Sequence, residues 1–373
     1  MGIDLHIDPF AYGDDIGPAK ILHIRTPSVG LRAIVVVDNV AAGPAIGGTR
    51  MAPDVSLAEC VRLARAMTLK NAACGLRHGG AKSVIFADPS MPIDEKERMI
   101  RAFATGIKSL HEYIPGPDMG TDETAMGWIH DEIGRAVGLP AEIGGIPLDQ
   151  IGATGFGVAI AAEVAANFIG LSLKGARVVV QGFGAVGEHA ARFLEKKGAR
   201  LVAVADIGGA ISNPEGIDIE ALTALKRQGK SVSHYPLARV IPGDDLVAVP
   251  CDIWIPAARP DVLRSDNVDR LDCRLVVQGA NVPTTRDAEM RMFARGVVSV
   301  PDFIANAGGV VSAAVEYGGG VASMAFTAIE EKVGRNTRLT LERARDMRIS
   351  PVEAAMTLSV DRLGKMVSLR RWR

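Results

Sequence analysis

The chain has 373 residues, of which 48% are hydrophobic and 23% charged, and its formal net charge at pH 7 is −1. A chain of this length is too long for one ordinary core, so it predicts two domains with the composition of a water-soluble globular protein. The balanced charge argues against a nucleic-acid-binding surface, because no Lys/Arg cluster stands out before the last few residues.

The cysteines and the N-terminus indicate a cytoplasmic protein. The four cysteines are Cys60, Cys74, Cys251 and Cys273. They show no CxxC spacing, which favours a reducing compartment without disulfides or a zinc site, and none of the seven histidines falls in a metal-binding pattern. Residues 1–10 lack the basic and apolar segments of a signal peptide. The longest apolar stretch, residues 153–170, is interrupted by Glu163 and Asn167, so we expect a buried helix rather than a membrane span.

The first part of the chain mixes strand-like and helix-like segments. Ala33–Asp38 is β-branched and apolar, which predicts a strand. Ser56 and Glu59 form a capping-box pattern at the start of a helix, and apolar residues then recur at helical spacing. Ser83–Ala87 predicts a second strand and Asp94–Leu110 a second helix.

Glycine and proline concentrate between Gly138 and Gly157, which predicts a hinge. Beyond it, apolar segments alternate with helical ones, so we expect an α/β domain with a parallel sheet covered by helices on both faces. Its expected strands are Arg177–Val180, Leu201–Ala205, Asp252–Ile255, Leu275–Val277 and Val297–Val300. The expected domains are residues 1–148 and residues 149–334.

A dinucleotide-binding motif follows the strand Arg177–Val180. Gly182 permits a tight turn, Gly184 lets the backbone approach a pyrophosphate, and Gly187 lets the following helix pack on the strand. The N-terminus of that helix attracts phosphates. A second strand ends at Asp206, whose carboxylate is placed to bind the ribose hydroxyls of the adenosine. The alternatives are a structural glycine turn and, for Asp206, a cap at the end of a strand.

The cofactor expected from this motif is NAD. Residues 207–209 supply no Arg or Lys for the 2′-phosphate of NADP, although a cation from a later loop would change that preference. The expected cofactor contacts in this region are Gly182, Gly184, Ala185, Val186, Gly187, Asp206 and Ala257.

Two lysines and an aspartate are candidates for the chemistry. Lys70 lies near the end of the first helix, and Lys82 follows Gly79–Ala81, where small residues permit close approach of a ligand. A desolvated lysine can give up its proton, whereas arginine cannot. Asp118 stands in a loop shaped by proline and glycine. Surface lysines and an ordinary turn aspartate are the alternatives.

Several motifs occur in the order in which the glutamate/leucine/phenylalanine/valine dehydrogenase family has them. They are Gly43–Met51, Met67–Asn71, Gly79–Lys82, Pro117–Thr121, Ala153–Gly155, Gln278–Pro283 and Pro301–Gly309. The chain resembles this family from about residue 25 to about residue 365. The resemblance implies an NAD(P)-dependent enzyme that converts an L-amino acid reversibly to its 2-oxo acid and ammonia.

The resemblance also implies how the domains are used. Residues 1–148 would form a substrate and oligomerisation domain, to which C-terminal helices from about residue 335 to residue 373 return. Residues 149–334 would form a Rossmann-type, doubly wound NAD-binding domain. Members of the family close a cleft between the two domains and assemble as homo-oligomers through the first.

Residue roles follow from the resemblance, position by position. Lys70 would bind the substrate α-carboxylate. Lys82 would be the catalytic lysine that activates water, and Asp118 its partner in proton transfer. On the cofactor side, Thr154 and Asn281 would hold the nicotinamide.

The resemblance is less uniform around the substrate. It places Asn306 near the amino-acid head group, and it makes Gly47 and Gly48 substrate-binding residues. The lysine that precedes these glycines in the glutamate branch is replaced by Ile46, and an assisting serine by Ala313. These replacements favour leucine, valine or phenylalanine as substrate.

Two alternatives stay open. Residues 213–219 and 282–285 resemble the glutamate branch, so glutamate dehydrogenase is the alternative within enzymes. A non-catalytic nucleotide-binding sensor on the same fold is the alternative of another class. The presence of Lys70, Lys82 and Asp118 together argues against a sensor, which needs none of them.

Overall fold

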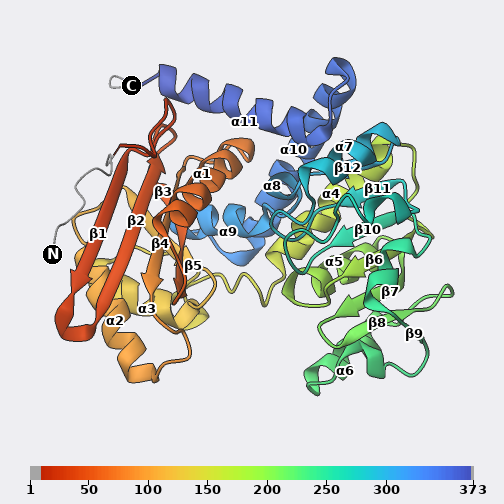
Figure 1. Cartoon of the computed structure of the whole chain (residues 1–373), viewed down its shortest axis with the longest axis horizontal. Helices are drawn as coiled ribbons and strands as arrows, with labels where there is room; N and C mark the ends of the chain where they lie inside the picture. Colours follow the sequence, from red (N-terminus) through yellow and green to blue (C-terminus); the bar gives the residue numbers. More distant parts are fainter. Residues whose placement is uncertain (1–9, 371–373) are drawn as a thin grey trace. The chain divides into compact units, whose positions relative to one another are not determined.

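The computed structural model describes residues 10–370, which form two compact units (Figure 1). The first unit contains the chain up to Pro147, Ala313–Val321 and the described residues from Ser359 on. The second unit contains Leu148–Ser312 and Ala322–Leu358. The division at Pro147 falls inside the glycine- and proline-rich segment. The signal-peptide analysis concerned residues 1–10, nearly all of which lie outside the described residues.

The C-terminal helices divide differently from the expectation. Residues 335–358 belong to the second unit, and only the chain from Ser359 returns to the first. The reason is that α10 (Ala322–Met347) packs along α4 (Ala153–Phe168), with Ile329 and Val333 buried on its inner face. The end of α11 (Pro351–Ser368) is held in the first unit, where Arg362 donates to the carbonyl of Ala73.

The first unit is built on a five-stranded mixed sheet in the order β1-β2-β4-β3-β5. The strands are β1 (Lys20–Thr26), β2 (Leu31–Asn39), β3 (Ala45–Ala52), β4 (Gly79–Phe86) and β5 (Tyr113–Pro117). β3 pairs in parallel with both β4 and β5, whereas β2 is antiparallel to its neighbours β1 and β4. The carboxyl ends of β3, β4 and β5 therefore lie at one edge of the sheet.

Helices cover both faces of this sheet. The helices are α1 (Leu57–Ala73), α2 (Ile93–Gly106) and α3 (Glu123–Ile133). α1 buries Cys60 and Ala64 against one face, while α2 and α3 bury Phe103 and Met126 against the other. The capping prediction for α1 is confirmed in part. The Ser56 side chain accepts from the amide of Glu59 at 3.1 Å, but the Glu59 carboxylate binds Arg50.

The second unit is built on a seven-stranded sheet in the order β12-β11-β10-β6-β7-β8-β9 (Figure 1). Its strands are β6 (Arg177–Gln181), β7 (Arg200–Asp206), β8 (Gly209–Ser212), β9 (Arg239–Ile241), β10 (Ile253–Pro256), β11 (Leu275–Val277) and β12 (Val298–Val300). The five expected strands are parallel. Two strands that the sequence did not indicate, β8 and β9, extend this sheet in antiparallel direction.

The remaining helices have one or more turns each. They are α5 (Ala185–Lys196), α6 (Ile219–Arg227), α7 (Arg286–Ala294), α8 (Asp302–Ala305) and α9 (Gly308–Tyr317). Short 3-10 turns stand at residues 27–29, 141–143, 232–234, 243–248 and 268–270. The apolar stretch from residue 153 forms α4, and within residues 10–370 no helix has both the length and the apolar composition to span a bilayer. All four cysteines are free thiols.

Candidate active site

Lys82 and Asp118 form a buried ion pair in the first unit. Lys82 lies in the middle of β4, and Asp118 directly follows β5, so the two strands that flank β3 deliver both side chains. Lys82 Nζ lies 2.8 Å from Asp118 Oδ2, and only 7% and 23% of the two side chains is exposed. The structure thus brings together the two residues predicted to carry the chemistry.

Two glycines of β3 permit close packing around this pair, each for a different reason. The strand registers place Gly48 opposite Gly116 of β5 and level with Lys82 of β4. A Cβ on Gly48 would lie 2.8 Å from Asp118 Cβ and 3.1 Å from Lys82 Nζ, so glycine at this position lets both side chains pack against β3. A Cβ on Gly47 would lie 1.8 Å from the carbonyl oxygen of Ala81, so that glycine permits the close packing of β3 on β4.

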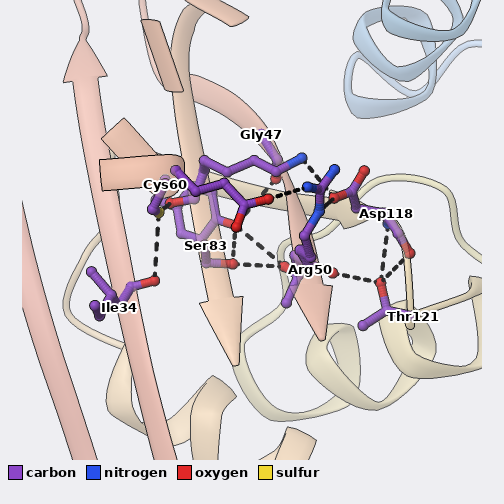
Figure 2. A network of polar contacts seen from close by, with 11 residues as sticks. Ile34, Gly47, Arg50, Cys60, Ser83, Asp118 and Thr121 are labelled. Carbon is purple, nitrogen blue, oxygen red and sulfur yellow. Dashed lines mark hydrogen bonds and ion pairs between the residues drawn. The ribbon is translucent and has the colours of Figure 1, made fainter. Parts of the chain in front are cut away.

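The loop that carries Asp118 is fixed to β3. Thr121 Oγ1 accepts from the Asp118 amide at 3.0 Å and donates to the Thr49 carbonyl at 2.7 Å (Figure 2). On the opposite face of the sheet, the Tyr113 hydroxyl lies 2.8 Å from Ser83 Oγ and 3.1 Å from the carbonyl of Gly47. Burial raises the pKa of Tyr113 well above its ordinary value, so this hydroxyl stays neutral and supports the backbone.

Arg50 is a member of the site that the sequence analysis missed. It lies two residues after Gly48 on the same face of β3, and its Nε donates to Asp118 Oδ2 at 2.8 Å (Figure 2). Its other donor group binds Glu59 at the start of α1. The signal was available, since Arg50 belongs to the Gly43–Met51 motif and residues two apart share a face of a strand.

The charges around Asp118 decide its protonation state. Burial alone would raise the pKa of the Asp118 carboxyl, but Lys82 and Arg50 together hold that pKa below its ordinary value. The pKa of Arg50 is in turn raised, because its two carboxylate partners outweigh the effect of burial. Asp118 is therefore an ionised carboxylate, able to accept a proton.

Lys70 lies in the last turn of α1, half-buried, on the helix that packs against β4. The contact between helix and strand is close. A Cβ on Gly80 would lie 2.0 Å from the amide nitrogen of Thr68. Asn71, the residue after Lys70, donates from Nδ2 to the carbonyl of Gly79 at 2.6 Å. Lys70 is thus carried on the helix end that is fixed at the start of β4.

An apolar cluster stands on the same sheet face as the ion pair. Ile46 of β3 lies opposite Ile114 of β5, and both contact Val137 and Ala313. The expectation that Ile46 and Ala313 belong to opposite domains is wrong, since Ala313 lies in the first unit. The helix of Ala313 is tied to this unit by Glu316, whose carboxylate accepts from the amides of Leu139 and Ile146.

The glycine motif of the second unit lines a cavity of about 870 Å³. Gly182 has φ +106°, and a Cβ there would lie 2.6 Å from the Cβ of Ala258. A Cβ on Gly187 would lie 1.9 Å from the carbonyl oxygen of Gly182, whereas nothing lies within 4 Å of one on Gly184. The N-terminus of α5, at Ala185 and Val186, therefore opens beside an unobstructed backbone turn. These residues, with Ala257 in the cavity wall, fit a dinucleotide pyrophosphate.

Asp206 ends β7 in the same cavity, but its carboxylate already has partners. It accepts from Ser231 Oγ at 2.7 Å and from the amide of Val232 at 3.1 Å, and it forms an ion pair with Lys226. Burial would raise the pKa of Asp206, yet these partners hold it below its ordinary value. A cation from a later element therefore does reach the position where the sequence beside Asp206 offers none.

Further basic side chains line this cavity. They are Arg259, Arg264 and Arg270. Arg264 binds Asp266 and Arg270 binds Asp245, so these two arginines already have acidic partners. Lys226 is thus the cation in direct contact with Asp206.

The predicted nicotinamide and head-group residues also lie in the second unit. Asn306 Nδ2 donates to Asn281 Oδ1 at 3.1 Å and to the carbonyl of Ala280 at 3.2 Å, which fixes the loop after β11. Within residues 10–370, the buried Asn306 Oδ1 has no hydrogen-bond partner. Thr154, at the start of α4, comes within 3.2 Å of a Cβ placed on Gly309. An orphaned acceptor beside Asn281 fits the amide of a nicotinamide or an amine of a ligand.

Comparison with known families decides what this arrangement belongs to. Residues 144–371 match the family Glutamate/Leucine/Phenylalanine/Valine dehydrogenase, and residues 18–135 match the Glu/Leu/Phe/Val dehydrogenase dimerisation domain. The chain belongs to this family. The resemblance noted in the sequence is thereby confirmed, and so is the fold of two α/β domains. The chain is an NAD(P)-dependent amino-acid dehydrogenase rather than a nucleotide sensor.

The curated relatives of this dehydrogenase include several glutamate dehydrogenases. The glutamate dehydrogenase of Aeropyrum pernix is 36% identical over 90% of this chain and 85% of its own length. The NADP-specific glutamate dehydrogenase of Saccharolobus shibatae is 38% identical over 75% of this chain and 69% of its own length. The family is NAD(P)-dependent, and its members similar to this chain include an NADP-specific enzyme.

Solved structures agree with the fold. The hetero-hexameric glutamate dehydrogenase from Thermus thermophilus, in a leucine-bound form, has a TM-score of 0.85 and 30% identity, covering 95% of this chain and 91% of its own. The L-tryptophan dehydrogenase from Nostoc punctiforme has a TM-score of 0.75, covering 94% of this chain and 97% of its own, and its 24% identity supports the fold alone.

Proposed function

We propose that this dehydrogenase deaminates an L-amino acid reversibly to its 2-oxo acid and ammonia, with Lys82 and Asp118 as its proton-transfer pair. The observation that carries the proposal is their buried contact at 2.8 Å, packed against Gly48. A base and a carboxylate in contact, shielded from water, are what general acid–base chemistry at an amine requires.

Lys82, Asp118 and Lys70 of the first unit each have a role in this reaction. When bound, the nicotinamide supplies the acceptor for the hydride that leaves the substrate Cα. Lys82, in its neutral form, takes a proton from water as the water attacks the resulting iminium carbon. Asp118 exchanges protons with the amine as ammonia forms. Lys70 binds the α-carboxylate, which stays charged throughout. These roles are supported by the position of each side chain on or against β4 and β5.

For the side chain of the substrate, we propose an aliphatic or aromatic group. Side chains two residues apart on a strand lie about 7 Å apart on one face, so Ile46 and Ile114 form the row next to Gly48 and Gly116. Ala313 and Val137 complete this apolar cluster. Burying an unpaired carboxylate there would cost several kcal/mol, whereas each buried CH₂ contributes about 0.8 kcal/mol.

Glutamate is the second candidate, and the relatives favour it. The curated glutamate dehydrogenases from Aeropyrum pernix and Saccharolobus shibatae are 36% and 38% identical to this chain. Glutamate as substrate would require a cation other than a residue at position 46 to bind the second carboxylate. The deciding experiment compares kcat/KM for all twenty L-amino acids. A preference for leucine, valine or phenylalanine supports the apolar cluster as the substrate pocket, whereas a preference for glutamate supports the relatives as the better guide.

For the cofactor, we propose that NAD is preferred and NADP is also accepted. Asp206 is the acidic residue at the end of β7 that favours the free ribose hydroxyls of NAD. Its ion pair with Lys226 reduces the repulsion that a 2′-phosphate would meet. The NADP-specific relative supports use of NADP within this framework. The test is the ratio of kcat/KM for the two nucleotides.

We propose that the chain assembles with copies of itself through the first unit. The support is the match of residues 18–135 to a dimerisation domain. Light scattering of the purified chain measures the mass directly. A mass of one chain at micromolar concentration would contradict this proposal.

A further inference from the structure

One oxygen of Asp118 accepts two hydrogen bonds from cations on different strands. Lys82 Nζ and Arg50 Nε each lie 2.8 Å from Asp118 Oδ2. Arg50 also reaches Glu59 in the first turn of α1, so a chain of charges runs from the helix through β3 to the end of β5 (Figure 2). The proton-transfer pair therefore has a second cation, and that cation has an anion of its own.

We propose that Arg50, bridged to Glu59, is a positioning residue that keeps the Asp118 carboxylate ionised and in place while Lys82 changes its charge. The proposal rests on the proton-transfer roles of Lys82 and Asp118 given above. Glu59 is assigned the opposing part, which is to moderate the charge of Arg50.

The need for a second cation follows from the chemistry. A lysine that serves as a base must pass through its neutral form, and in that form it attracts a carboxylate far less. An arginine does not lose its proton under any working condition. Arg50 therefore offers Asp118 Oδ2 a constant partner at 2.8 Å while Lys82 exchanges protons. Without it, a partly buried carboxylate beside a neutral lysine would tend to take up a proton.

The environment of Glu59 explains its part in this network of charges. Ser56 caps the first turn of α1 by accepting from the Glu59 amide, which leaves the Glu59 carboxylate available for Arg50. The Arg50 and Glu59 side chains are 19% and 25% exposed, so their interaction is screened less than that of a surface pair. An arginine without this partner would lower the pKa of Asp118 further and make Asp118 a weaker base.

Two further titratable groups beside the ion pair are neutral. The Cys60 thiol of α1 faces the backbone of β4, and burial raises its pKa to about 12. Burial likewise raises the pKa of Tyr113 on β5. Lys82 and Arg50 are thus the cations that lower the pKa of Asp118, and Glu59 is the anion paired with Arg50.

The test is the pH profile of kcat/KM, whose acid limb reports the loss of a proton from the coupled Lys82–Asp118 pair in the free enzyme. Arg50→Gln should move this limb upward by about one pH unit or more, because an opposite charge has been removed. Glu59→Gln should move it downward by about half a unit, because Arg50 then acts unopposed. The double variant should return toward the wild-type limb. A purely structural role predicts lower activity in both single variants without opposite shifts.

Three controls make the profile interpretable. Arg50→Lys keeps the charge and should keep the limb near that of the wild type, even where kcat falls. Arg101→Gln removes a matched arginine whose partners Glu97 and Asp131 lie in α2 and α3, and it should leave the limb unchanged. Binding of NADH, measured by fluorescence, reports whether the second unit of each variant is intact.

The proposal is overturned if the acid limb of Arg50→Gln and Glu59→Gln stays where it is in the wild type. It is also overturned if the acid limb moves in the same direction in both variants. If Arg50→Gln does not fold, Glu59→Gln alone decides, since an unchanged or raised limb contradicts the assigned charge balance. Failure of the underlying function is distinguishable, because Asp118→Asn would then keep its activity or the wild type would deaminate no amino acid. An active wild type that depends on Asp118, with limbs unmoved by these variants, refutes only the role of Arg50.

Discussion

Ile46 lies opposite Ile114 on neighbouring parallel strands, in the row of side chains next to the glycines that flank Lys82. Both isoleucines are almost fully buried, and Ala313 closes the same cluster. If this cluster receives the substrate side chain, a leucine-type amino acid should exceed glutamate by at least about a hundredfold in kcat/KM, because pockets of mismatched polarity discriminate strongly.

Ile46→Lys combined with Ala313→Ser should narrow or reverse that ratio. The new ammonium group would extend from the same face of β3 as Gly48 and give a second carboxylate a partner. The matched control is Ile46→Met with Ala313→Ser, which alters shape without adding charge. The measurement is kcat/KM for leucine and glutamate with each variant. An unchanged ratio in the lysine variant, with the fold intact, would show that the side chain binds elsewhere.

Lys82→Ala should lower kcat by a factor on the order of 10²–10⁴, and Asp118→Asn should do likewise, because each removes a proton-transfer group from the pair. Lys70→Ala should instead mainly raise the KM of the amino acid, since the α-carboxylate is charged in every state. Steady-state kinetics give kcat and KM for the three variants. Titration with NADH shows whether each variant is folded. Turnover near that of the wild type in Lys82→Ala would refute its role.

Asp206→Ala should raise the ratio of kcat/KM for NADP over NAD by about tenfold, because a charged hydrogen-bond partner of the ribose hydroxyls is lost and the repulsion of a phosphate is relieved. Lys226→Met should shift the ratio in the other direction, since Lys226 is the cation bound to Asp206. Initial rates with each nucleotide at saturating amino acid give the ratio. Shifts of the same sign in the two variants would contradict this account.

Glu289 should make the stability depend on pH. Burial raises its pKa to about 7, although Gln278 and Ser299 donate hydrogen bonds to it. The folded chain therefore binds a proton that the unfolded chain has released, so stability falls as pH rises from the unfolded pKa toward about 7. Glu289→Gln should be more stable than the wild type at pH 8 by an amount on the order of 1–3 kcal/mol. At pH 5 the difference in stability between the two should be smaller. Thermal unfolding at the two pH values tests this.

The fold was predictable where local pattern and tertiary structure agree. Arg177–Val180 and Leu201–Ala205 are apolar β-branched runs, and both are strands of the parallel sheet. β8 and β9 were not predicted from the sequence. Gly208 and Gly209 indicate only a turn, and strands of four and three residues show little periodicity. Their pairing beside β7 is a tertiary contact that no short window contains.

The site was predictable residue by residue but not contact by contact. Lys82 and Asp118 were both singled out, yet the sequence alone does not show that β5 ends at Pro117 and delivers Asp118 to Lys82. Glu59 was assigned to a helix cap, which is a local interaction, whereas its carboxylate binds Arg50 from another element. For Asp206 the sequence left open a cation such as Arg227 or Lys226, and only the structure shows that Lys226 of α6 is the one in contact.

The account rests most on the claim that this chain removes an amine from an L-amino acid and passes the hydride to a nicotinamide nucleotide. The direct measurement is the product balance of the purified wild-type chain with its best amino acid and NAD. Reduced nucleotide, ammonia and 2-oxo acid should form in equal amounts, and Lys82→Ala should form all three at a rate lower by a factor on the order of 10² or more. Reduction of the nucleotide without release of ammonia, or no reduction with any of the twenty amino acids and either nucleotide, would contradict it.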